Sequence, residues 1–81
     1  MVLKYITKGG AELSAYTYSK LKGRIAERYG TRKNFAKALN LSETAISLKL
    51  NNKTFFSQED IEKWSGLLGI SVEEYGEYFF A

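Results

Sequence analysis

The sequence contains no cysteine, no histidine and no proline, and its one aspartate is Asp60. Without cysteine there are no disulfides or thiol nucleophiles, and without histidine the commonest general base and metal ligand is missing. No apolar run approaches the roughly 20 residues that cross a membrane, and residues 1–8 lack the architecture of a signal peptide. We therefore expect a cytoplasmic protein that is not an enzyme, with no metal, cofactor, small-molecule ligand or membrane partner.

What the chain does have is an uneven distribution of charge. It has 81 residues, of which 44% are hydrophobic and 26% charged, as expected of one folded domain. The net charge of +3 combines +7 over residues 17–53 with −5 over residues 54–81. A basic part of this kind indicates a surface that faces a polyanion, and the alternative is accidental clustering on a solvated surface.

Apolar residues at helical spacing first occur at Tyr18, Leu21, Ile25 and Tyr29, and Gly30 then ends this helix. Four more helices are predicted to begin at residues suited to N-capping, namely Thr31, Ser42, Ser57 and Ser71. The sequence therefore predicts an all-α fold, a compact bundle of five short helices over residues 17–81. Residues 1–16 are predicted to be a loosely ordered N-terminal arm.

Residues 31–53 read TRKNFAKALNLSETAISLKLNNK, and their spacing has a steric logic. Ala36 is small where two helices cross, and Asn40 tolerates the left-handed backbone of a tight bend. Leu41 is expected to fill the corner and Ile46 to hold the next helix inward. This stretch resembles the helix-turn-helix of phage Cro-type and repressor-type DNA-binding domains.

The resemblance covers about residues 18–80. In detail, the sequence is similar to small phage-encoded regulators of Gram-positive bacteria. The matching stretches are Tyr18-Ser19-Lys20-Leu21, Ser47-Leu48-Lys49-Leu50-Asn51 and Glu77-Tyr78-Phe79-Phe80. The resemblance implies a lambda-repressor-like fold and a sequence-specific, Cro-like transcriptional repressor in a bacterial host cell. Two positions depart from the family pattern: Asn40 stands where glycine is usual, and Lys49 where an apolar residue is usual. Lys49 predicts a rotated or frayed end of the recognition helix, residues 42–51.

Counting 100° per residue from Ile46 places an outer face on the recognition helix, which would enter the major groove. The candidate base-reading residues are Ser42, Glu43, Thr44, Ser47 and Leu48. Ser42 has an alternative role as a cap and Glu43 as a charge that favours the helix N-terminus. Leu48 is expected to pack on a thymine methyl, unless a rotated helix end turns it into the core.

Phosphate contacts are expected where the second helix begins and just after the recognition helix ends. The candidates are Thr31, Arg32, Lys33, Asn51, Asn52 and Lys53. Ordinary surface charge is the alternative reading of these residues, and it is the preferred one for most cations of the first helix.

The expected partner is double-stranded operator DNA, bound by a homodimer. The acidic, aromatic-rich residues 54–81 are the expected dimer surface, with Phe79 and Phe80 as the first positions to test. An alternative function keeps the fold but binds another protein, as an antirepressor does. The basic character of residues 17–53 favours DNA binding over this alternative.

Overall fold

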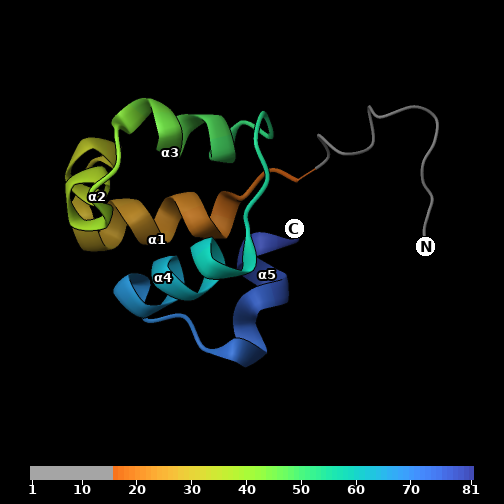
Figure 1. Cartoon of the computed structure of the whole chain (residues 1–81). Helices are drawn as coiled ribbons and strands as arrows, with labels where there is room; N and C mark the ends of the chain where they lie inside the picture. The colour runs from red at the N-terminus through yellow and green to blue at the C-terminus, as the bar shows by residue number, and fades with distance from the viewer. Residues whose placement is uncertain (1–15) are drawn as a thin grey trace.

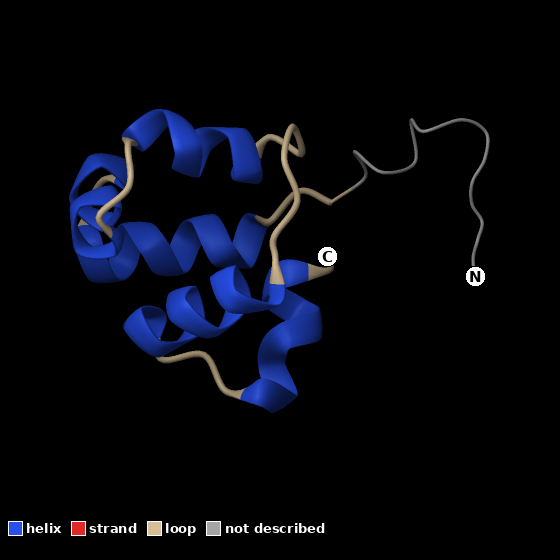
Figure 2. Cartoon of the chain, viewed as in Figure 1, coloured by secondary structure: helices blue, strands red, loops and turns tan. Residues whose placement is uncertain are grey.

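Helices make up the regular structure of residues 16–81, the part of the chain that the computed structural model describes. They are α1 (Ser19–Tyr29), α2 (Arg32–Leu39), α3 (Glu43–Leu50), α4 (Gln58–Leu68), the 3-10 turn η3 (Val72–Glu74) and α5 (Tyr75–Phe79). In Figures 1 and 2, α1 runs through the middle, with α3 on one side and α4 and α5 on the other. The predicted all-α fold of five helices is confirmed, while the predicted arm lies outside the described residues apart from Tyr16.

The helices α2 and α3 both begin at a hydroxyl cap, as predicted. The Thr31 hydroxyl accepts a hydrogen bond from the Asn34 N–H at 3.1 Å, and the Ser42 hydroxyl accepts one from the Ala45 N–H at 3.1 Å. Each bond satisfies one N–H group that a helix start leaves without an intrahelical partner. The two starting points, and with them the length of the connection, are therefore fixed by local chemistry.

The turn between α2 and α3 is closed by the backbone. Asn40 has a φ of 59°, and its N–H donates to the carbonyl of Lys37, while the Leu41 N–H donates to the carbonyl of Ala36 at 2.9 Å. This pair of bonds is a Schellman motif, which ends a helix at a left-handed residue. The prediction for Asn40 is confirmed, but the one for Leu41 is wrong. Its side chain is 42% exposed, because Leu41 closes the turn with its backbone while the fully buried Phe35 fills the space beneath.

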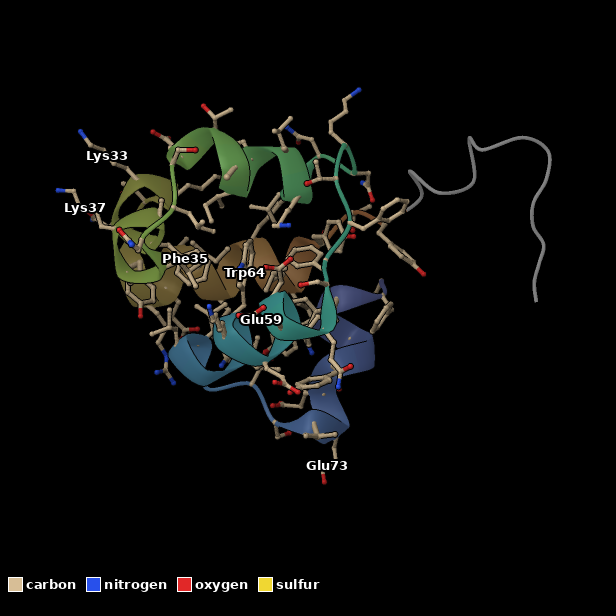
Figure 3. The ribbon with its side chains drawn as sticks, viewed as in Figure 1. Lys33, Phe35, Lys37, Glu59, Trp64 and Glu73 are labelled. Atoms are coloured by element: carbon tan, nitrogen blue, oxygen red, sulfur yellow. The ribbon has the colours of Figure 1, made fainter. Side chains whose placement is uncertain are left out.

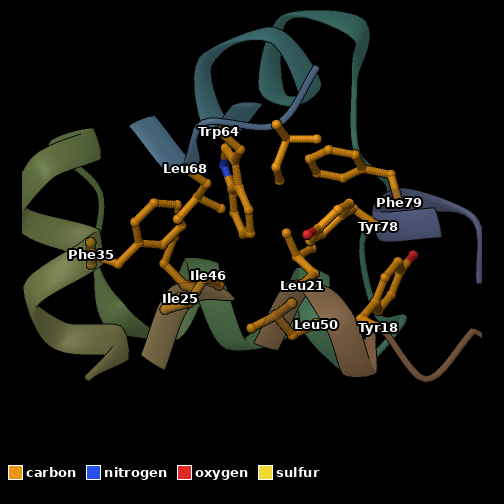
Figure 4. Packing of buried hydrophobic residues seen from close by; sticks show 12 residues of the cluster. Tyr18, Leu21, Ile25, Phe35, Ile46, Leu50, Trp64, Leu68, Tyr78 and Phe79 are labelled. Carbon is orange, nitrogen blue, oxygen red and sulfur yellow. The ribbon is translucent and has the colours of Figure 1, made fainter. Parts of the chain in front are cut away.

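The core gathers around Trp64 of α4, which is fully buried (Figure 4). Its ring meets Phe35 at 4.9 Å and Phe56 at 4.7 Å between centroids, both edge to face. Such pairs stabilise a core beyond the area that they bury. The buried aliphatic and tyrosine side chains around them include Tyr18, Leu21, Ile25, Ile46, Leu50, Leu68, Ile70 and Tyr78. The predicted inward faces of α1 and α3 are therefore confirmed.

The C-terminal part starts its elements with capping boxes. Ser57 and Asp60 exchange hydrogen bonds of 3.0 and 2.9 Å at the start of α4, and Ser71 and Glu74 form the second box. The predicted last helix is divided, since a 3-10 turn precedes α5. Phe79 is 1% exposed and belongs to the core, whereas Phe80 is 53% exposed, so Phe80 has the greater area free for contact and the predicted dimer stays a prediction.

Candidate functional site

The exposed side of α3 is the side that the sequence predicts. Ile46 and Leu50 are buried at 0% and 1% exposure, whereas Glu43 and Thr44 are exposed and Leu48 is 40% exposed. The helix stays regular through Leu50, so the predicted rotation or fraying of its end is wrong, and Leu48 is not a core residue. Its contact with a base stays a prediction.

Two of the predicted contact residues bind one another. The Arg32 guanidinium donates to the Ser47 hydroxyl at 3.3 Å, and both residues are half-buried. The bond joins the first residue of α2 to the middle of α3. A predicted phosphate ligand and a predicted base-reading residue are therefore part of one local arrangement, and a change of either one affects the other.

The two capping hydroxyls lie at the starts of α2 and α3. Thr31 and Ser42 are both exposed, and each hydroxyl oxygen accepts the bond that starts its helix. A hydroxyl that accepts in this way keeps its own proton to donate. Their capping role is thus established by the geometry, and a ligand contact by either remains a prediction.

The turn after α3 combines Asn51, Asn52 and Lys53. Asn51 and Lys53 are exposed, but Asn52 is half-buried and its side-chain N–H₂ donates to the carbonyl of Tyr16 at 2.8 Å. Asn52 has a φ of 62°, in the left-handed region that asparagine tolerates. This amide therefore ties the start of the described chain to the end of α3.

Cations lie around α2 and around the turn after α3 without an acidic partner among residues 16–81. Figure 3 shows Lys33 and Lys37 directed away from the body of the molecule beside the turn into α3, far from Glu59 and Glu73. Lys33, Lys37 and Lys53 are all exposed. Three exposed cations of residues 17–53 thus lie on α2 and in the turn after α3, the two elements that flank α3 in the chain.

Cations of α1 are held instead by the C-terminal part of the chain. Lys20 forms an ion pair with Glu77, and Arg24 donates to the Leu68 carbonyl at 2.6 Å and to the Tyr78 hydroxyl at 2.7 Å. Both side chains are engaged within the protein, whereas the sequence favoured ordinary surface charge for most cations of this helix. They join α1 to α4 and α5.

Lys49 is also engaged inside the protein. Its ammonium lies 2.9 Å from the Asp60 carboxylate and donates to the Phe55 carbonyl at 3.0 Å, with 15% of the side chain exposed. Burial opposes ionisation of Asp60, but hydrogen bonds from Lys49 and Ser57 outweigh it and hold the pKa of this carboxyl below its ordinary value. Sequence analysis missed this pair, although a lysine at a normally apolar position and a lone aspartate were its signal.

One consequence for the site is that the exposed side of α3 carries no cation, since its one lysine pairs with Asp60. It presents a carboxylate, hydroxyls and an apolar side chain, from Glu43, Thr44, Ser47 and Leu48. The cations lie around this neutral to acidic strip.

No helix within residues 16–81 has the length and apolarity to cross a membrane.

The fold and this surface define a small all-helical domain built around two short capped helices and a tight turn. The chain belongs to the family described as protein of unknown function (DUF739), whose model matches residues 14–81. It is also similar to the solution structure of the modulator of repression (MOR) of the temperate bacteriophage TP901-1 from Lactococcus lactis. The identity is 42% and the TM-score 0.75, over 82% of this chain and 89% of the other. Comparison with curated proteins finds no match. The similarity connects this chain with the regulatory proteins of phages.

Proposed function

We propose that this chain is a phage regulator that modulates repression by binding double-stranded operator DNA through α2 and α3. The observation that carries the proposal is the arrangement of these helices: two caps, a left-handed turn at Asn40, an exposed side of α3, and cations around it. Two short helices joined in this way form a helix-turn-helix, which places its second helix in the major groove. The DNA is thus met by α3, while α2 crosses the backbone.

Bases are read from the outer side of α3. Glu43 accepts from a cytosine amino group, and Thr44 contacts one of several bases through its hydroxyl. Leu48 packs on a thymine methyl, the apolar feature of the major-groove edge. Ser42 and Ser47 complete the set, Ser42 from the capped first turn and Ser47 from its position against Arg32.

Phosphates are held by the surrounding cations and by helix starts. Lys33, Lys37 and Lys53 are exposed and neutralise phosphate charge, and Arg32 does so next to α3. The N–H groups of the first turn of α2, beside Thr31, face the backbone in the same way, as does Asn51 after α3. Asn52 contributes indirectly. Its side-chain amide binds the carbonyl of Tyr16 and so fixes the turn, and it does not bind a phosphate.

Regulation in this account follows from concentration and competition for the operator, with no catalytic step. The test is a gel shift with the DNA that flanks the gene of this chain, against a shuffled duplex of the same composition. Lys33→Glu with Lys37→Glu reverses charge beside α3 and is expected to abolish the shift. The matched control is Lys63→Glu, which changes a cation of α4 that pairs with Glu59 at 3.0 Å, and it is expected to leave the specific shift in place. Failure of the wild-type chain to prefer flanking DNA contradicts the proposal.

A second function is favoured by one observation, the neutral and partly apolar character of the strip that α3 presents. Leu41 and Leu48 are 42% and 40% exposed, and the one lysine of α3 is paired with Asp60. An apolar centre with a charged rim is typical of protein interfaces. In this alternative the chain modulates repression by binding the phage repressor protein, its basic rim facing acidic groups.

Titration of the purified chain with purified repressor in the absence of DNA separates the two functions. Leu41→Ser and Leu48→Ser weaken a protein complex together, because both side chains lose apolar contact. In the DNA account Leu41→Ser leaves operator affinity nearly unchanged, and no complex forms without DNA.

A further inference from the structure

A hollow lined by aromatic side chains opens beside the end of α3. Its volume is about 150 Å³, and the rings that line it include Tyr18, Phe56 and Phe79 of the core and the more exposed Tyr16 and Phe80. Tyr16 is 39% and Phe80 53% exposed, and their rings meet edge to face with centroids 6.3 Å apart. Figure 4 shows Tyr18 and Phe79 together at one end of the core. The hollow is thus an extension of the core that is open to solvent.

Three parts of the chain build the hollow, and hydrogen bonds hold them together. The Asn52 side chain binds the Tyr16 carbonyl at 2.8 Å, and the Tyr18 N–H donates to the carbonyl of Ala81 at 3.0 Å. Lys49 holds the carbonyl of Phe55 at 3.0 Å. These bonds give the hollow a fixed shape before anything occupies it, which lowers the entropic cost of binding there.

Phe55 stands at the edge of this hollow with 80% of its surface exposed. Its backbone is fixed by Lys49, so the phenyl ring is presented to solvent from a held position. No other aromatic ring among residues 16–81 packs against it with a centroid contact, whereas Phe56 meets three rings. An exposed phenyl on a fixed loop is a side chain without a partner in the monomer.

The lining of the hollow carries no charge. Besides the aromatic residues it contains Asn52 and Thr54, both neutral. This is unusual in a chain in which 26% of the residues are charged. A neutral, apolar patch of this kind marks an interaction site, and two identical copies of it meet without repulsion between like charges.

We propose that this hollow is the contact surface of a homodimer, in which Phe55 of each copy enters the hollow of the other. A two-fold interface uses the same patch on both subunits, so a protruding group and a cavity must lie side by side on one surface. Phe55 and the aromatic hollow satisfy that condition. A cavity of about 150 Å³ with apolar walls is large enough to hold a benzene ring, the size of the Phe55 side chain. Edge-to-face contacts with Tyr16 and Phe80 then add to the burial.

The position of the hollow is compatible with a free α3. In Figure 1 the C-terminus and the chain leading into α1 lie at the end of the molecule where α3 finishes, and none of residues 43–48 of α3 lines the hollow. The dimer does not depend on the proposed function, because none of the proposed base-reading residues lines the hollow and Asn52 is the one residue that the hollow shares with the turn after α3.

The test measures self-association of the full chain without DNA. Sedimentation equilibrium from about 10 µM to about 1 mM is expected to show a monomer–dimer equilibrium with a dissociation constant of about 1 mM or tighter. Phe55→Ser is expected to weaken association at least about tenfold while the melting temperature stays unchanged, because the side chain is 80% exposed. Val72→Ser is the matched control, since Val72 is 70% exposed and does not line the hollow.

Amide NMR shifts of the wild-type chain, followed with concentration, locate the contact. Movement of the Asn52, Thr54 and Phe80 signals is expected. A chain that is monomeric up to about 1 mM overturns the proposal, and so does equal weakening by Phe55→Ser and Val72→Ser, or association that moves only signals of α2 and α3. None of these outcomes depends on DNA binding, so failure here is distinguishable from failure of the proposed function.

Discussion

Lys49 and Asp60 join the end of α3 to the start of α4 through an ion pair of 2.9 Å, with 15% and 25% of their side chains exposed. The same carboxylate accepts the N–H of Ser57 in the capping box of α4. One acidic group thereby fixes the start of α4 and the last turn of α3. The orientation of the exposed side of α3 depends on a residue that has no part in contacting a ligand.

This pair predicts the response of the protein to acid. The pKa of Asp60 is lowered in the folded chain, so its contribution to stability is complete above the unfolded value of about 3.9 and is lost as the pH falls through the folded value. Asp60→Asn retains an oxygen for capping but removes the charge. We expect it to cost about 1 kcal/mol at pH 7 and much less at pH 2.5, measured by urea unfolding at both pH values.

The control for this experiment is Glu59→Gln, which neutralises the neighbouring residue. Glu59 pairs with Lys63 on an exposed stretch of α4, and water screens that pair. Its substitution is expected to leave the dependence of stability on pH close to that of the wild-type chain. Equal acid responses of the Asp60→Asn and wild-type proteins contradict the role given to the Lys49–Asp60 pair.

Leu48 and Ile46 lie on opposite sides of α3 and predict opposite results. Ile46→Ala opens a cavity under a fully buried side chain and is expected to cost about 2–5 kcal/mol. Leu48→Ala is expected to cost less than about 1 kcal/mol, because the side chain is 40% exposed, yet to reduce the preference for one thymine. Thermal unfolding measures the first effect, and binding to a duplex with uracil at each thymine in turn measures the second. A uracil effect that persists in Leu48→Ala argues against contact with the methyl group.

Asn40 controls the turn through its left-handed backbone. Asn40→Ala is expected to lose about 1 kcal/mol of unfolding free energy, since alanine pays a steric cost at a φ of 59°. Asn40→Gly is expected to stay within about 0.5 kcal/mol of the wild type. If both variants unfold alike, the backbone conformation is not what selects asparagine here.

Much of this fold is predictable from sequence because its signals are local. The caps at Thr31 and Ser42 and the left-handed turn at Asn40 depend on neighbouring residues only. The inward positions of Ile46 and Leu50 follow from helical period. The net charges of +7 over residues 17–53 and −5 over residues 54–81 likewise indicate that the first of these segments carries the basic surface.

The remaining features are tertiary and have no local signal. The outward position of Leu41, the burial of Phe79 and the pairing of Lys49 with Asp60 depend on which side chains have already filled the core. The exposure of the Phe55 ring also has no local signal. Phe55 and its neighbour Phe56 are the same residue type, and only Phe56 packs against the core. The binding of Asn52 to Tyr16 joins residues 36 apart in the sequence.

The cations around α3 predict a strong dependence of DNA binding on salt. If about six phosphates are neutralised per protomer, affinity falls about 10³-fold between about 50 and 200 mM salt. Arg32→Ala is expected to reduce the salt slope by about one unit and, because it also removes the bond to Ser47, to change the base preference. Arg24→Ala is a control for loss of an arginine, because Arg24 binds Leu68 and Tyr78 inside the protein, and it should leave the slope unchanged once the fold is shown to be intact.

The central claim is that the exposed side of α3, with the start of α2, binds operator DNA. The most direct measurement is an NMR titration of the isotope-labelled chain with a duplex from the DNA that flanks its gene and that the chain shifts in the gel. The account predicts that the amide signals of residues 31–33, 42–48 and 51–53 move and that signals of residues 62–67 of α4, which line neither the DNA site nor the hollow, do not. Unchanged signals with the duplex, together with movement of the same residues on addition of the phage repressor protein alone, contradict the claim.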